Sequence, residues 1–184
     1  NSDVTIGKLV AFFTSIDAPH LKAGSIAKLV AAGFKTPEDI IKMSPADLVR
    51  VLGANGKKGH DGLRKSLTDI PYYKLFGAHA TERGIGVRKI KKLQTYLGQD
   101  ELMSGDISVD KIARIPGFES TTAKKVTLDW MRFQDFLASI AGYYTIEAEK
   151  VVGTALQDQK IVFSGFRDKD LQTAVEQAGG TMQS

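Results

Sequence analysis

Cysteine is absent from the sequence, which excludes a disulfide framework and any zinc site with cysteine ligands. The three histidines, His20, His60 and His79, are scattered without the spacing of metal ligands, so we expect no metal site. No apolar run approaches the ~20 residues that a membrane-spanning helix needs. Residues 1–6 also lack the basic and then apolar pattern of a secretory signal. We therefore expect a cytoplasmic protein without membrane contact.

Positive charge exceeds negative charge only mildly in this sequence. The 184 residues carry a net charge of +4, and the pI is about 9.2. Residues 1–150 hold 22 Lys and Arg against 17 Asp and Glu, whereas residues 151–184 hold 3 against 4. The positive excess therefore lies in the front part, where it would attract a polyanion. A solvated helical surface can carry the same excess, so the charge alone is weak support for such a partner.

The spacing of apolar residues predicts helices throughout residues 1–150. Apolar side chains recur at steps of three and four residues, as in the series Ile6, Leu9, Val10 and Phe13. Capping residues mark the starts of three helices: Thr36, Ser44 and Ser108. A stripe at helical spacing is expected in the core: Trp130, Phe133, Phe136 and Leu137. We predict a mainly α domain over residues 1–150.

The composition changes toward the end of the sequence. Residues 160–166 (KIVFSGF) form a short β-rich apolar run that is typical of a buried strand. Residues 168–177 fit a helix that stops at Gly179 and Gly180. One β-α unit cannot bury both of its faces. We therefore expect residues 160–184 to be the start of an α/β domain, joined to the helices by a linker at residues 151–159.

A repeat runs through the helical part. Residues 44–53 (SPADLVRVLG) and 108–117 (SVDKIARIPG) share a cap, an apolar residue four positions later, an arginine at the seventh position and a final glycine. Residues 83–90 contain a third copy of the turn that follows, and residues 20–27 a poorer fourth copy. The equivalent residues of the four turns are predicted to be Ala23, Gly56, Gly86 and Glu119, at spacings of 33, 30 and 33.

Glycine in the turn between two helices can help to form an anion-binding site. Glycine permits a positive φ and a close approach of the backbone to another surface. The helix that follows begins with unpaired N–H groups and the positive end of its dipole, which together attract phosphate. Basic residues occupy the start of three such helices: Lys57 and Lys58, Arg88 and Lys89, and Lys124 and Lys125. Contacts of this kind would position nucleic acid without reading its bases.

These turns resemble helix-hairpin-helix motifs, whose consensus is roughly apolar–Pro–Gly–apolar–Gly–three residues–Ala. Residues 115–123 (IPGFESTTA) match it except at Glu119, which replaces the second glycine. Gly84 and Gly86 match both glycines, and residues 53–56 (GANG) carry one extra residue. The first copy has Ala23 where a glycine is expected, so contact between its turn and DNA is an open alternative.

Four such units followed by residues 160–166 resemble the back half of bacterial-type NAD-dependent DNA ligases. The resemblance implies four helix-hairpin-helix units and then a truncated α/β segment similar to a BRCT domain. It implies binding of double-stranded or nicked DNA, without catalytic residues or a cofactor in this chain. The implied DNA-binding residues are Gly53, Gly56, Lys57, Lys58, Gly84, Gly86, Arg88, Lys89, Gly117, Ser120, Thr121 and Lys124.

The resemblance also implies partners outside this chain. N-terminal ligase domains would supply the catalysis with NAD and a divalent metal, and the BRCT-like part is a candidate for binding a protein partner. The family usually has a four-cysteine zinc module before the hairpins. Its absence leads us to expect a chain that starts after that module, or a divergent lineage such as a viral one. The location would be the nucleoid region of the cytoplasm, or the host cytoplasm for a viral protein.

Three other interpretations remain at this point. Ligases attach AMP to the lysine of a Lys-x-Asp-Gly motif, and residues 58–62 (KGHDG) differ from that motif by one inserted residue. The second hairpin already explains these residues. The chain could also be the hairpin module of another DNA repair protein, although the BRCT-like tail argues against it. A helical repeat for protein–protein contact fits the spacing, but not the glycines at the helix junctions.

Overall fold

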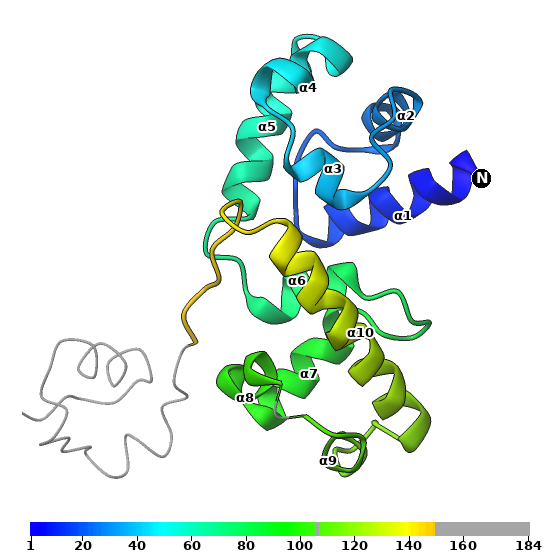
Figure 1. The fold of residues 1–184 in the computed structure, drawn as a ribbon, viewed down its shortest axis with the longest axis vertical. Coiled ribbons are helices and arrows are strands. Elements are labelled where there is room, and N and C mark those ends of the chain that lie inside the picture. The colour runs from blue at the N-terminus through cyan, green and yellow to red at the C-terminus, as the bar shows by residue number, and fades with distance from the viewer. Residues whose placement is uncertain (106, 150–184) are drawn as a thin grey trace, which may run out of the picture. The chain divides into compact units, whose positions relative to one another are not determined.

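The computed structural model describes residues 1–105 and 107–149, and every regular element in this part of the chain is an α-helix (Figure 1). The helices are α1 Ser2–Ser15, α2 Ala23–Ala31, α3 Pro37–Ile41, α4 Pro45–Leu52, α5 Asn55–Ser66, α6 Tyr72–His79, α7 Val87–Leu97, α8 Gln99–Ser104, α9 Val109–Ala113 and α10 Ser120–Ser139. Residues Asn1–Glu147 form one compact unit. The mainly α prediction is confirmed for the described residues, whereas the predicted linker 151–159 and α/β segment 160–184 lie outside them.

The three predicted capping residues begin helices as expected. The side chains of Thr36, Ser44 and Ser108 accept hydrogen bonds from the N–H groups of Asp39, Asp47 and Lys111. Proline occupies the first position of α3 and of α4, where the missing N–H has no intrahelical partner to lose. Local sequence therefore determines where these helices start.

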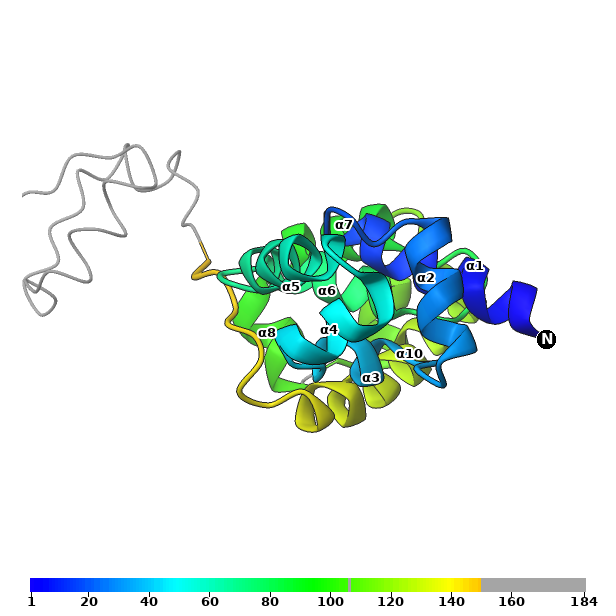
Figure 2. The same ribbon diagram turned by 90° about the horizontal axis from the view of Figure 1, so that it is seen from above.

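Four pairs of consecutive helices account for the most extensive helix contacts: α1 with α2, α4 with α5, α6 with α7, and α9 with α10 (Figures 1 and 2). Two glycines permit the closest approaches. A Cβ added to Gly56 of α5 would lie 2.5 Å from the backbone of Leu48 in α4. A Cβ added to Gly77 of α6 would lie 2.4 Å from Cα of Val87 in α7. In these two pairs, helix packs on helix through backbone contact.

The aromatic core centres on α10. The ring of Phe133 stacks on Phe76 of α6 at 4.9 Å, and Phe136 contacts Phe12 of α1 edge-on at 5.7 Å. Phe133 and Phe136 are buried, while Trp130 and Leu137 pack against the core from partly exposed positions. Each buried phenylalanine contributes about 1.5–3 kcal/mol relative to an exposed one. Helix α10 therefore holds helices from different parts of the chain around one core.

The chain after α10 returns to the connection between α5 and α6. Ile70 and Ile146 form an isolated parallel β-bridge, with Ile70 N–H donating to the carbonyl of Thr145 at 2.9 Å and Glu147 N–H donating to the carbonyl of Ile70 at 2.8 Å. The guanidinium of Arg64 lies over the ring of Tyr143 at 5.0 Å. These contacts attach residues 143–147 to the helical unit. Within the two described ranges, no helix is both long and apolar enough to cross a membrane.

Two glycines of α5 provide a matched test of the close helix packing. Gly56→Ala should destabilise the fold by about 1–3 kcal/mol, because the new methyl group overlaps the backbone of α4. Gly59→Ala places its methyl 3.9 Å from the nearest side-chain atoms, and should stabilise the helix by up to about 1 kcal/mol. Chemical denaturation measures both free energies of unfolding. Equal effects of the two substitutions would show that α4 and α5 do not approach so closely.

Candidate functional site

Each of the four interhelix turns contains a residue with a positive φ. The last such residue before the second helix is His20 (φ 65°), Gly53 (73°), Gly84 (87°) or Gly117 (89°). These positions are separated by 33, 31 and 33 residues, close to the repeat period in the sequence. Glycine adopts this conformation without strain, and histidine is among the other residues that adopt it more often than most. The repeat in sequence is therefore also a repeat in backbone conformation at this position.

The turns between α1 and α2, α6 and α7, and α9 and α10 continue in the same way. The positive-φ residue is followed by a buried apolar side chain: Leu21, Ile85 or Phe118. Next comes an extended N-cap residue: Lys22 (φ −99°, ψ −174°), Gly86 (−154°, −171°) or Glu119 (−81°, 172°). The apolar side chain anchors the turn in the core, and the N-cap residue starts the second helix at the surface. We call these three turns the anchored turns.

The structure corrects two of the predicted equivalences. Lys22, and not Ala23, corresponds to Gly86 and Glu119, so the first turn has a lysine at its N-cap. Gly56 has no counterpart among the N-caps, because it lies inside α5 and is buried against α4. The turn after α4 also departs from the others, since the exposed Ala54 is already helical (φ −56°, ψ −31°). The repeat in sequence misplaced these residues because the second turn is built differently.

The second helix of every pair starts without a side-chain cap. Within the described residues, the N-termini of α2, α5, α7 and α10 receive no side-chain hydrogen bond. The first helices α1, α4 and α9 are capped by Asn1, Ser44 and Ser108, and α6 starts after Pro71 without a side-chain cap. The first N–H groups of a helix have no intrahelical acceptor, and the helix dipole adds partial positive charge there. Ends without a side-chain cap leave these N–H groups to bind an anion, except in α5, where Gly56 N–H donates to the carbonyl of Gly53 at 2.9 Å.

Four predicted basic residues stand free beside these ends. Lys57, Lys58, Arg88 and Lys124 are exposed and form no ion pair or side-chain hydrogen bond with the described residues. Ser120 and Thr121 are likewise exposed, in the first turn of α10. Gly84 is exposed and Gly86 half-buried, and a Cβ on either would meet only open space. All of these residues are accessible to a ligand.

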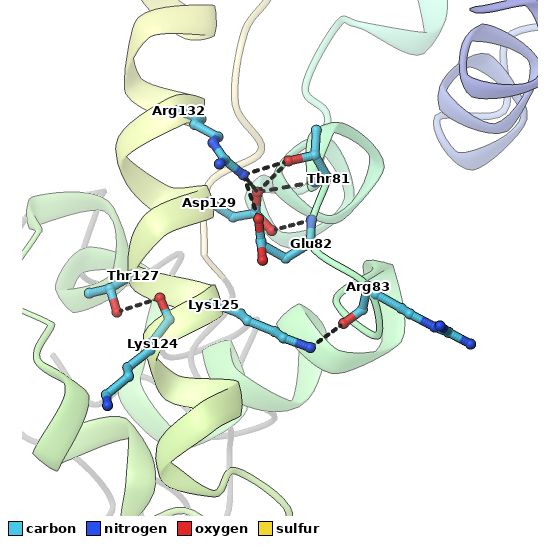
Figure 3. A network of polar contacts seen from close by, with 8 residues as sticks. All are labelled: Thr81, Glu82, Arg83, Lys124, Lys125, Thr127, Asp129 and Arg132. Atoms are coloured by element: carbon cyan, nitrogen blue, oxygen red, sulfur yellow. Dashed lines mark hydrogen bonds and ion pairs between the residues drawn. The ribbon is translucent and has the colours of Figure 1, made fainter. Parts of the chain in front are cut away.

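Two basic residues instead connect neighbouring anchored turns. The ammonium of Lys89 donates to the carbonyl of Gly117 at 3.0 Å and lies 5.1 Å from the centre of the Phe118 ring. The ammonium of Lys125 donates to the carbonyl of Arg83 at 3.2 Å, as Figure 3 shows. The turn after α6 and the turn after α9 are therefore linked in both directions. Sequence reasoning assigned Lys89 only to phosphate and missed this link.

A buried carboxylate on α10 holds the chain that leads into Gly84. Asp129 is 1% exposed and accepts three hydrogen bonds of 3.0 Å, from Thr81 N–H, the Thr81 hydroxyl and Glu82 N–H (Figure 3). Arg132 donates to the Thr81 hydroxyl and to Glu82, both at 2.8 Å, and the Glu82 carboxylate raises the pKa of Arg132. Sequence reasoning missed this network. The sequence feature that could have indicated it is the position of Asp129, three residues after Val126 and four before Phe133, on the core side of a helix.

No group of three or more His, Cys, Asp or Glu side chains in the described ranges could hold a metal ion. His79 packs in the core instead, with its ring stacked on Phe136 at 4.3 Å. Burial lowers the pKa of His79, so its imidazole is neutral at pH 7. His20 has its role in the backbone of the first turn.

Nearly the whole chain is similar to a segment of a known protein. It is 31% identical over 191 residues to a protein named DNA ligase from Acanthamoeba polyphaga mimivirus. The aligned region covers 98% of this chain and 30% of that protein, so the chain spans less than a third of the length of its relative. No protein-family model matches the chain.

The two glycines of the turn after α6 should respond differently to the same substitution. Gly84→Ser should destabilise the fold by about 1–2 kcal/mol, because a side chain is strained at φ 87°. Gly86→Ser should change stability by only a few tenths of a kcal/mol, since its backbone is extended, its surroundings are open and serine is a good N-cap. Thermal unfolding of both variants checks the assignment. A larger loss for Gly86→Ser than for Gly84→Ser would contradict the described turn.

Proposed function

We propose that this chain is the non-catalytic DNA-gripping part of a DNA ligase, and that its four helix pairs are helix-hairpin-helix units. The units would bind the phosphates of double-stranded or nicked DNA along the minor groove, without regard to sequence. One observation carries the proposal: the second helix of every pair starts uncapped, directly after a turn with a positive-φ residue. The relative that is named DNA ligase makes DNA the anion that fits best.

The predicted residues would act in three ways. The N-terminal N–H groups of the second helices bind phosphate, which includes the backbone at Gly86, Ser120 and Thr121. Exposed cations add attraction without reading bases: Lys57, Lys58, Arg88 and Lys124. The remaining residues shape the turns, with Gly53, Gly84 and Gly117 supplying the positive φ, Gly56 the close helix packing and Lys89 the link to the next turn. The first turn joins this set through Lys22, which stands at its N-cap.

The other activities of a ligase would lie outside the described residues. We propose that N-terminal ligase domains carry out the reaction with NAD and a divalent metal, as the resemblance to bacterial-type ligases implies. Residues 160–184 would begin a BRCT-like domain that binds a protein partner. The sequence similarity supports the ligase relationship, while NAD dependence rests on the resemblance of the hairpins and the tail.

Binding should depend strongly on salt and little on DNA sequence. If each of three or four hairpins neutralises about two phosphates, some 6–8 phosphates are neutralised, and log K should fall against log salt with a slope near −5 to −7. Fluorescence anisotropy with nicked duplex, intact duplex and single-stranded DNA measures the slope and the preference among the three. A slope near zero, or a strong preference for one duplex sequence, would favour a protein-interaction repeat over the proposed function.

Glu119 should weaken the grip of the last turn. Its exposed carboxylate stands at the N-cap of α10, where Gly86 stands in α7, and it makes no capping hydrogen bond. Glu119→Gln should therefore tighten DNA binding at 0.1 M salt by up to about 8-fold, the contribution of one phosphate contact at a slope of ~0.9. Asp135→Asn makes the same charge change at an exposed position further along α10 and serves as the control. An equal gain in both variants would mean that only net charge matters.

A further inference from the structure

The buried carboxylate of Asp129 is paired with N–H groups of the chain before α7 and with the guanidinium of Arg132, which lies 3.5 Å away. Asp129 lies in the apolar core between Val126 and Phe133, with 1% of its surface exposed. Removing a carboxylate from water costs several kcal/mol, and well-packed apolar side chains often replace buried ion pairs without loss of stability. All of the hydrogen bonds that it accepts at 3.0 Å come from Thr81 and Glu82, in the connection between α6 and α7. Its contacts therefore fix the position of this connection.

The connection fixed by Asp129 leads directly into a proposed phosphate-binding turn. Thr81 and Glu82 precede Gly84 by three and two residues, and α7 starts at Val87. Ile85 N–H also donates to the carbonyl of Glu82 at 3.1 Å. The position of Glu82 therefore determines where Ile85 and the turn lie. Gly86, the N-cap residue of α7, has no side chain that could hold this turn in place by a capping hydrogen bond.

A second contact from α10 holds Arg83, the residue between Glu82 and Gly84. Lys125 of α10 donates to the carbonyl of Arg83 at 3.2 Å, while the Arg83 side chain extends away from α10 (Figure 3). The neighbouring Lys124 points elsewhere and makes no such contact through its ammonium group (Figure 3). Three successive residues, Thr81 to Arg83, are thus held by one helix.

We infer that Asp129 and Lys125 are positioning residues that hold the turn after α6 in its phosphate-binding conformation, so that the last hairpin controls the grip of the hairpin before it. The inference rests on the proposed function. It assigns two contacts within the protein to the strength of DNA binding, although neither residue needs to touch DNA. Energetic coupling between the two hairpins follows, because the hydrogen bonds join α10 to the connection that precedes α7.

Asp129→Asn tests the inference, because the amide retains one acceptor but presents N–H to an N–H of the connection. If the turn after α6 neutralises about two phosphates, losing it would make the salt slope less negative by up to about 1.8 and weaken binding at 0.1 M salt by up to about 60-fold. Circular dichroism and thermal unfolding verify that the variant is folded under the binding conditions. Unchanged affinity in the folded variant would overturn the inference.

A double-mutant comparison separates positioning from general destabilisation. Gly86→Glu places a carboxylate in open space at the N-cap of α7 and should weaken this one turn, as Glu119 does in α10, while Lys58→Glu weakens the turn after α4. Asp129→Asn should have a clearly smaller effect on affinity in the Gly86→Glu background than in the Lys58→Glu background, where its effect should be full. Equal effects in both backgrounds would overturn the inference in favour of a purely structural role.

Lys125→Met keeps the test decisive if Asp129→Asn does not fold, because this lysine lies outside the core. Its effect on binding should shrink in the Gly86→Glu background, whereas the effect of the matched control Lys124→Met should stay at full size there. A Lys125→Met effect of full size in that background would overturn the inference. If the unchanged chain does not bind DNA at low salt, the proposed function fails and the inference fails with it. If the unchanged chain binds DNA and the backgrounds do not differ, only the inference fails.

Discussion

The positive φ of one residue in each turn is the constraint on which the helical unit depends. His20, Gly53, Gly84 and Gly117 turn the chain so that two consecutive helices pack together. In the three anchored turns, the next side chain then enters the core and the one after it starts the second helix at the surface. The same backbone conformation therefore produces both the packed helix pair and the exposed helix end. Packing and phosphate binding have a common origin in this turn.

Helix α10 combines two roles that are often separate. Its aromatic residues Phe133 and Phe136 build the core with α1 and α6. One turn earlier, Asp129 anchors the connection to α7, and near its start Lys125 reaches the same connection. A change in the packing of α10 would therefore be felt at the turn after α6, which is the turn with both hairpin glycines. Core and surface are coupled through a few hydrogen bonds and not through the apolar contacts alone.

The features predicted correctly from sequence are those that neighbouring residues determine. Thr36, Ser44 and Ser108 cap helices because the acceptor and the N–H lie three residues apart. The glycines were harder to interpret, since sequence cannot tell a positive φ (Gly84) from an extended backbone in open space (Gly86) or a close helix contact (Gly56). The role of Asp129 was not predictable, because its partners lie 47 and 48 residues away in the sequence.

The most direct test of the account is a titration of the ¹⁵N-labelled chain with a short duplex, followed by amide chemical shifts. Uncapped helix ends that bind phosphate should give the largest shifts at the first three amides of α2 and α7, Ala23 to Ser25 and Val87 to Lys89. The capped starts of α4 and α9 should shift less, because Ser44 and Ser108 already accept hydrogen bonds from the N–H groups of Asp47 and Lys111. Shifts of equal size at the capped and uncapped ends, or shifts confined to other surfaces, would contradict phosphate binding by the second helices.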